Sequence, residues 1–131
     1  MAAITHSKVI ASGYIGRKGA AKLKFRIHGI KLVGMIDTGF TGFISLPLPL
    51  AERFNLTPSG IAVAVMADGA QHVMVTSKAP VKFAGKVREG TVFVEPNANI
   101  ILVGMDFLHK FHLGLIVTKN KVYLVDEFYE P

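Results

Sequence analysis

The sequence predicts a mainly β protein that closes into a small barrel, and three observations support this fold class. Residues alternate strictly between polar and apolar from Lys22 to His28, as in a strand with one buried face. An Asp-Gly pair, Asp68-Gly69, separates two runs rich in β-branched residues, which is typical of a tight hairpin turn. Only two stretches can form helices, and both are short. Short strands, short loops and two brief helices together describe a closed β domain.

The composition indicates one compact domain covering residues 1–131. The chain has 50% hydrophobic and 18% charged residues, which excludes disorder, and folding should remove roughly two-thirds of the unfolded chain's surface from water. It contains no Cys, so we expect no disulfide framework and a reducing, cytoplasmic location. No apolar run approaches the ~20 residues of a membrane-spanning helix, and Met1 to Lys8 lacks the apolar stretch of a secretory signal. We therefore expect a soluble protein with no membrane partner.

A basic hairpin is predicted near the N-terminus. Gly29 ends the alternating run and Lys31 to Ile36 forms a second strand, so the two strands pair across a turn. The formal net charge is +6, and seven basic residues precede the first acidic one, Asp37: Lys8, Arg17, Lys18, Lys22, Lys24, Arg26 and Lys31. The solvated face of the hairpin explains most of this charge. A nucleic-acid surface is the less favoured interpretation, because no nucleic-acid-binding motif accompanies it.

The remaining elements follow from β-branched runs and helix-start signals. Further strands are predicted at Ile61–Met66, His72–Thr76, Val81–Phe83, Gly90–Val94, Ile100–Val103, Leu115–Thr118 and Val122–Val125. Pro49 can occupy the first turn of a helix that runs to about Phe54, where its missing N–H costs nothing. Asp106 can cap a second helix that runs to about Phe111, because its side-chain oxygen can satisfy a free N–H of the first turn.

The most unusual local feature is Asp37-Thr38-Gly39, which places a carboxylate at the end of an apolar strand. A carboxylate beside a hydrophobic core is costly unless nearby groups donate hydrogen bonds to it or a function retains it. Thr38 supplies a hydroxyl, and Gly39 lets a backbone N–H approach without a Cβ in the way. The tripeptide alone is a weak signal, because Asp-x-Gly is ordinary turn chemistry.

The context of this motif strengthens it. Downstream, Ile100 to Leu108 repeats the same architecture, with an apolar strand, a glycine and a polar helix start. The Asp68-Gly69 hairpin lies between the two segments. This ordered set resembles the retropepsin-like aspartic proteases, in which an Asp-Thr-Gly loop, a flap hairpin and an apolar-apolar-Gly segment follow one another. The similarity spans Leu23 to Leu115 and is greatest to the small single-domain bacterial members.

The resemblance implies a retropepsin-like closed β-barrel with a flap hairpin and one or two short helices. It also implies a homodimer that cleaves peptides, because each subunit of that family provides one catalytic Asp. Carried over by position, the catalytic residue is Asp37, its loop is supported by Thr38, Gly39, Val103 and Gly104, and the flap tip that covers the substrate is Ala67, Asp68, Gly69 and Ala70. The sequence has one such motif where two carboxylates are required, so a second copy must supply the other. No cofactor is implied.

Two residues depart from the family pattern. Phe40 follows the Asp-Thr-Gly motif where Ala or Ser is usual in the viral and pepsin-type enzymes, so it either narrows the site or packs beneath it. Met105 follows the downstream glycine where viral members carry an Arg that anchors the subunit interface, so the dimer contacts must differ.

Other interpretations remain open. A protein with this fold can bind peptides or dimerise without catalysis, since fold does not imply function. His109 and His112 have a spacing that can hold zinc, but no third ligand is near and we expect no metal. The glycines from Gly13 to Gly19 match no phosphate-binding motif and predict a turn. Ser45 lacks the Gly-x-Ser-x-Gly frame of a serine hydrolase.

Overall fold

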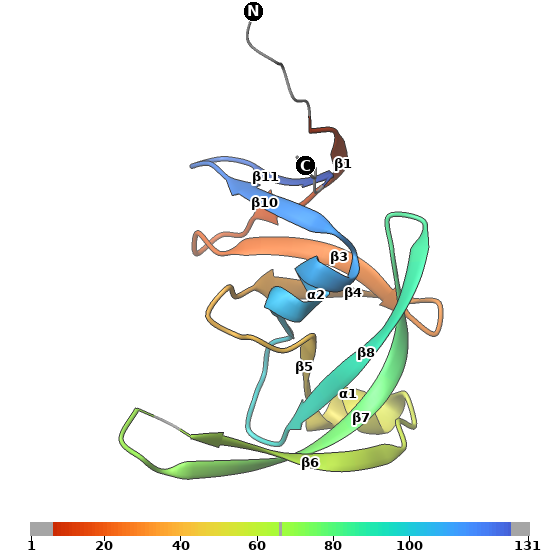
Figure 1. Cartoon of the computed structure of the whole chain (residues 1–131), viewed down its shortest axis with the longest axis vertical. Helices are drawn as coiled ribbons and strands as arrows, with labels where there is room; N and C mark the ends of the chain where they lie inside the picture. The colour runs from red at the N-terminus through yellow and green to blue at the C-terminus, as the bar shows by residue number, and fades with distance from the viewer. Residues whose placement is uncertain (1–6, 66, 127–131) are drawn as a thin grey trace, which may run out of the picture.

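The structure is a computed structural model that describes residues 7–65 and 67–126 (Figure 1). In chain order its elements are β1 (Val9–Ser12), β2 (Tyr14–Ile15), β3 (Ala21–Ile27), β4 (Ile30–Ile36), β5 (Ile44–Pro47), α1 (Leu48–Arg53), β6 (Pro58–Val65), β7 (Gln71–Phe83), β8 (Lys86–Glu95), β9 (Leu102–Val103), α2 (Met105–Lys110), β10 (Leu113–Val117) and β11 (Val122–Asp126). No helix among the described residues has the length and apolar character needed to cross a membrane.

The main sheet closes on itself. Its eight strands lie in the order β2-β3-β4-β9-β5-β8-β7-β6, and β3 also pairs with β7. This extra pairing completes a ring of β3, β4, β9, β5, β8 and β7, while β2 and β6 lie outside the ring. A separate three-stranded sheet has the order β1-β11-β10. The predicted mainly β fold with a closed barrel and two short helices is confirmed.

The β3–β4 hairpin forms where the alternating run predicted it. Leu23, Phe25 and Ile27 are buried in the core, while Lys24 and Arg26 on the other face are exposed. The two turn residues, His28 and Gly29, both have positive φ (49° and 77°), which matches the right-handed twist of the flanking strands. The hairpin therefore fixes the pairing of β4 with β3. β4 ends at Ile36, directly before Asp37.

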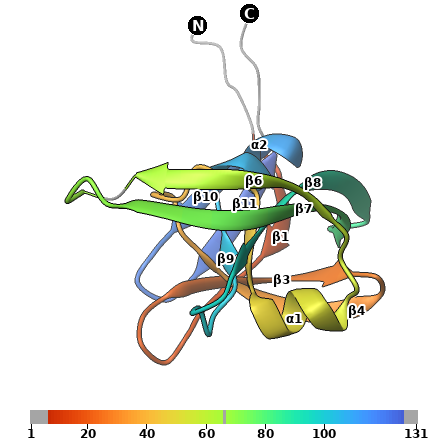
Figure 2. The ribbon, with the colours of Figure 1, turned by 90° about the horizontal axis from the view of Figure 1, so that it is seen from below.

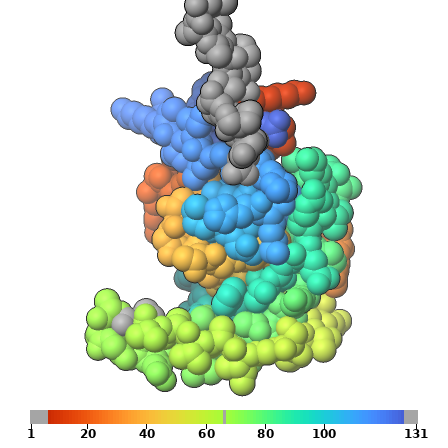
Figure 3. Space-filling view, in the orientation of Figure 1, coloured from red at the N-terminus to blue at the C-terminus, as the bar shows by residue number. Residues whose placement is uncertain are grey.

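The hairpin of β6 and β7 is longer than predicted and stands out from the body. Seven residue pairs join the two strands, and Figures 2 and 3 show the hairpin projecting past the rest of the molecule. Gly69 has φ 86°, and the Ala70 N–H donates to Asp68 Oδ1 at 2.9 Å, as expected for an Asp-Gly turn. Met66, the last residue of the predicted first strand, lies outside the described residues.

The predicted separate strand at Val81–Phe83 is wrong, because these residues continue β7 without a break. The intervening Pro80 lies beyond Ser77, where pairing with β6 ends, and before Val81, where pairing with β3 begins. A proline is tolerated there because it has a hydrogen-bonding neighbour on one side only, namely β8. The predicted strand at Ile100–Val103 is also shorter, since β9 covers Leu102 and Val103.

The two helices begin differently from one another. Pro49 lies in the first turn of α1, as predicted. Asp106 is not the cap of α2: the N-cap position is Gly104, and Asp106 lies inside the first turn. The first N–H groups of α2 are already satisfied, because Gly104, Met105 and Asp106 donate to backbone carbonyls of the loop after Asp37. A side-chain cap is therefore unnecessary.

The core of the barrel is centred on Phe107 of α2, which is fully buried. Its ring centroid lies 4.7 to 6.0 Å from those of Phe25, Phe43, Phe83 and Phe111, in tilted or edge-on arrangements. Such aromatic pairs add to the free energy gained by burial. The packing fixes α2 against the barrel, and this positions the loop that carries Asp37.

Candidate active site

Asp37 begins the turn that follows β4. Its backbone N–H donates to the carbonyl of Val103 at 2.9 Å, and its carbonyl accepts from the N–H of Phe40 at 3.1 Å. The Gly39 N–H donates to Asp37 Oδ1 at 2.9 Å. The carboxylate thus has the backbone donor expected from the sequence. Thr38 is exposed, and its hydroxyl makes no hydrogen bond with the described residues of the single chain.

The loop is braced from the side by β9 and the start of α2. Ile36 pairs with Val103 in parallel register, and Val103 also pairs with Ile44 of β5. Gly104 N donates to Phe43 O at 3.0 Å, Met105 N to Phe40 O at 2.8 Å and Asp106 N to Gly42 O at 3.1 Å. The two supporting residues implied by the resemblance, Val103 and Gly104, are therefore in direct hydrogen-bond contact with the Asp37 loop.

Phe40 packs into the wall of this loop. Its ring is half-buried and lies edge-on to Phe93 of β8, with the ring centroids 5.5 Å apart. A Cβ added at Gly42 would lie 2.5 Å from Phe40 Cζ and 2.7 Å from a Phe93 ring carbon. The loop can thus hold a phenylalanine after Asp-Thr-Gly because Gly42 and Gly104 have no Cβ in the space that its ring occupies. The ring both packs against the loop and narrows the space beside it.

A cleft of about 710 Å³ opens between this loop and the hairpin of β6 and β7. Its walls are mostly apolar, with polar side chains at Thr41, Ser45, Glu95 and Asn97. The lining residues are Gly39, Phe40, Thr41, Gly42, Ser45, Ala62, Val63, Ala64, Val65, Met74, Phe93, Glu95, Asn97, Ala98, Ile100 and Leu102. The cleft therefore begins at Gly39, two residues after Asp37, and runs beneath the hairpin.

The predicted flap-tip residues lie at the far end of the hairpin. Ala67, Asp68 and Gly69 do not line the cleft, while Ala70 lines a smaller adjoining recess with Gln71, His72, Met74 and Glu95. The hairpin residues that do face the cleft come from the stems of β6 and β7. In the single chain, the outer end of the hairpin extends beyond the body of the molecule (Figure 1).

A polar pair that the sequence analysis did not find closes the outer end of the cleft. His72 Nε2 lies 3.0 and 3.1 Å from the two carboxylate oxygens of Glu95, and the side chains are 40% and 22% exposed. The contact lies past Val75 and Val94, the last paired residues of β7 and β8. The tight turn at Ala84-Gly85 sets the register of β7 on β8, but that register continued outward would place Met74, not His72, opposite Glu95, so no local signal in the sequence points to this contact.

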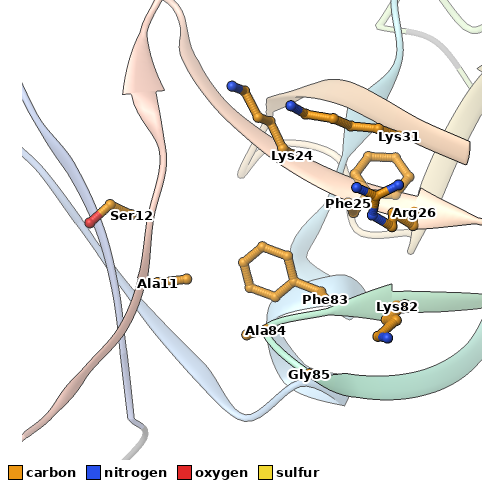
Figure 4. A pocket seen from close by; sticks show the side chains of 10 residues that line it. All are labelled: Ala11, Ser12, Lys24, Phe25, Arg26, Lys31, Lys82, Phe83, Ala84 and Gly85. Atoms are coloured by element: carbon orange, nitrogen blue, oxygen red, sulfur yellow. The ribbon is translucent and has the colours of Figure 1, made fainter. Parts of the chain in front are cut away.

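The basic residues gather elsewhere, on the outer face of the barrel. Arg26 of β3 lies directly opposite Lys31 of β4 and directly opposite Lys82 of β7. These residues and Lys24 are among those that line a recess of about 350 Å³ (Figure 4). Asp37 follows Lys31 by six positions, which is roughly 20 Å along an extended strand. The basic face is therefore separate from the Asp37 cleft.

The described residues contain no group of three or more His, Cys, Asp or Glu side chains that could hold a metal ion. The pair His109 and His112 thus has no third ligand of these types within the described part of the chain.

The chain resembles proteins of known structure in its fold. No known protein-family profile and no curated protein matches the sequence. A retropepsin-like aspartic protease from Rickettsia conorii matches the structure with a TM-score of 0.71 and 21% sequence identity, over 92% of this chain and 94% of that one. The chain has a retropepsin-like fold. The solution structure of the simian foamy virus (mac) protease also matches, with a TM-score of 0.54 and 22% identity, over 67% of this chain and 91% of that one.

The retropepsin-like fold accounts for the arrangement of the three predicted segments. The Asp37 turn, the hairpin of β6 and β7, and the β9–α2 segment meet around one cleft, although they are far apart in sequence. Barrel closure through β4, β9 and β5 brings the first and third segments together. At these sequence identities the likeness is one of fold, and the chemistry has to be argued from the residues.

Proposed function

We propose that residues 1–131 form one retropepsin-like aspartic protease domain that acts as a homodimeric endopeptidase. The observation that carries this proposal is the Asp37 turn, with the carboxylate held by the Gly39 amide beside an apolar cleft. The sequence contains one Asp-Thr-Gly, and peptide hydrolysis of this type requires two carboxylates. A twofold dimer would place the same loop of each subunit face to face.

Two carboxylates at close range cannot both ionise without a large repulsive energy, so the pair would share one proton. The ionised Asp37 would accept a proton from a water molecule as that water attacks the scissile carbonyl carbon. The protonated Asp37 of the partner subunit would donate its proton to the carbonyl oxygen, and a proton would pass to the amine as the C–N bond breaks. This mechanism is the established one for aspartic proteases.

The residues around Asp37 hold its loop and form the walls that such a site needs. The Gly39 amide and the Val103 carbonyl fix the loop, so the carboxylate keeps its orientation when a substrate arrives. The stems of β6 and β7 offer an apolar roof to an extended peptide, and closure of the hairpin would exclude bulk water.

One observation favours a second candidate, a peptide-binding or dimerisation module without catalysis. Phe40 occupies space beside the Asp37 turn where the viral and pepsin-type enzymes carry a small residue. A groove narrowed in this way can hold a peptide without admitting the attacking water in the required geometry.

Substitution of the carboxylate by its amide separates the two candidates. We expect the wild-type protein to cleave apolar peptides at mildly acidic pH and Asp37→Asn to lose cleavage by at least ~100-fold, because an amide cannot exchange the proton. Peptide products are measured by mass spectrometry. Asp126→Asn is the matched control, since Asp126 is an exposed residue of β11 and should leave cleavage unchanged. Equal turnover by wild type and Asp37→Asn would remove the endopeptidase proposal, and binding without turnover by either would support the module.

A further inference from the structure

The structure points to a charge-selective position at the outer end of the cleft: we propose that Glu95 binds a cationic side chain of the peptide, lysine or arginine, and that His72 competes with it. The inference rests on the proposed function in one respect, which is that a peptide occupies the cleft. It names the class of peptide that would be favoured there.

The charge of the cleft depends on one residue. Among the described residues that line it, Glu95 is the sole ionisable one, and most of the others are apolar. A carboxylate with low-dielectric walls on several sides attracts cations more strongly than one in open solvent. A peptide that carries a positive charge at this point would therefore gain an interaction that a neutral peptide lacks.

Glu95 also has unused hydrogen-bonding capacity. An ionised carboxylate can accept about four hydrogen bonds. Within the described residues its side chain has one partner, the Nε2 atom of His72, which faces both oxygens. The side chain remains 22% exposed, so an incoming ammonium or guanidinium group can reach it.

The position of Glu95 fits a substrate side chain a short distance from the reacting bond. Glu95 follows Phe93 by two residues on the same face of β8, and Phe93 contacts Phe40 of the Asp37 turn. Two residues of a strand span roughly 7 Å. A peptide extended along the cleft would thus present a side chain to Glu95 about two residues beyond the one that contacts the aromatic pair.

His72 is the group that competes for Glu95, because its Nε2 atom faces both carboxylate oxygens. Besides the pair, the adjoining recess is lined by Ala64 of β6 and by Ala70, Gln71 and Met74, none of which carries a charge. Asp68, the acid at the tip of the hairpin, accepts a hydrogen bond from Ala70 N. An incoming cation must therefore share the Glu95 oxygens with His72 or displace it.

Binding measured on the Asp37→Asn protein tests this proposal without requiring hydrolysis. The probes are fluorescent apolar nonapeptides that carry one lysine, moved position by position, and the same peptides with norleucine in its place. At one position we expect the lysine peptide to bind about tenfold more tightly in fluorescence anisotropy, as for a charge-assisted hydrogen bond in a partly exposed site. Adding Glu95→Gln should abolish this ratio while the norleucine peptide binds as before, which also shows that the cleft is intact.

The His72 variant supplies the second arm. Adding His72→Gln should keep the lysine preference, because the amide can donate to Glu95 but carries no positive charge that competes with the peptide. The proposal is overturned if no position shows a lysine preference, if Glu95→Gln retains it, or if no peptide binds at millimolar concentration. Failure of the wild type to cleave a peptide that binds with the Glu95-dependent preference would instead count against the endopeptidase alone.

Discussion

Gly104 shows how closely the loop that carries Asp37 is packed. Its φ of −103° and ψ of −173° are extended values that any residue can adopt, so backbone conformation does not require glycine. The space around Gly104 does require glycine, because an added Cβ would lie 2.2 Å from the Gly42 carbonyl oxygen and 2.6 Å from the Phe40 carbonyl oxygen. Both oxygens accept hydrogen bonds from the start of α2 and cannot move without breaking them.

We therefore expect Gly104→Ala to lower the free energy of unfolding by about 1–3 kcal/mol, the usual cost of overpacking, and to reduce peptide cleavage as the loop shifts. Urea denaturation measures the first effect. Gly29→Asn is a suitable comparison, because Gly29 has open space around it and asparagine tolerates a positive φ. A Gly104→Ala protein as stable as the wild type would show that the loop is looser than its geometry indicates.

Arg26 is placed in an electrostatically unfavourable position. It faces Lys31 on one neighbouring strand and Lys82 on the other, and like charges directly opposite each other destabilise a sheet. The described residues form two ion pairs, His72–Glu95 and Asp106–Lys110, neither of which involves these cations.

Lys31→Glu should consequently raise the free energy of unfolding by ~0.2–1 kcal/mol, because it replaces a like-charge pair by an opposite one. Lys18→Glu, in the exposed turn between β2 and β3, changes the net charge equally and should have a smaller effect. The gain of Lys31→Glu should shrink as salt is added during urea denaturation. Equal effects of the two substitutions would mean that net charge, and not the facing pair, sets the stability.

At the level of elements, the outer part of the hairpin of β6 and β7 has few contacts with the rest of the fold. β6 pairs with β7 alone, and Ile61 and Val65 are 72% and 70% exposed. Beyond the last β7–β8 pair, the His72–Glu95 contact links the hairpin to the body. Segments with few buried contacts open at low free energy, so this hairpin is suited to move over the cleft.

Hydrogen exchange should detect this difference. Amides of residues 61–65 and 71–75 should exchange faster than those of β3 and β4, after correction for intrinsic rates. His72→Ala should speed the exchange of the hairpin amides further, because the contact with Glu95 is lost, whereas His109→Gln, at an exposed histidine of α2, should leave their exchange unchanged. A hairpin as protected as the barrel would contradict its role as a moving element.

Elements set by local chemistry could be predicted from the sequence, and those set by distant partners could not. The β3–β4 hairpin follows from alternation and Gly29, and the turn at Gly69 from its Asp-Gly pair. The unbroken β7 was missed because Pro80 is read as a strand end unless its neighbours are known. Asp106 was misassigned as a cap because the acceptors for the first turn of α2 come from a loop about sixty residues earlier.

In the candidate site, too, the features set by local sequence could be predicted and those set by distant partners could not. The motif and its family resemblance predicted Asp37, the Gly39 donor and the proximity of Val103 and Gly104 to the loop. The His72–Glu95 contact lies beyond the last β7–β8 pair, where the register would place Met74 opposite Glu95, so neither alternation nor the position of the turn predicts it.

For the whole molecule, the central claim is that one chain holds half of an active site. Each chain brings one Asp37 turn, and the cleft beside it is open in the single chain. Two copies carry the same net charge of +6, so their association should strengthen with added salt until apolar contacts dominate. The dimer is therefore best examined at or above physiological ionic strength.

A crystal structure of the assembled protein would test directly whether two chains form one active site. We expect two chains related by a twofold axis, with the Asp37 carboxylates about 3 Å apart, the separation at which they share a proton. The hairpins of β6 and β7 should lie over the pair from both sides. A monomer at high protein concentration, or a dimer that leaves the two carboxylates far apart, would contradict the account.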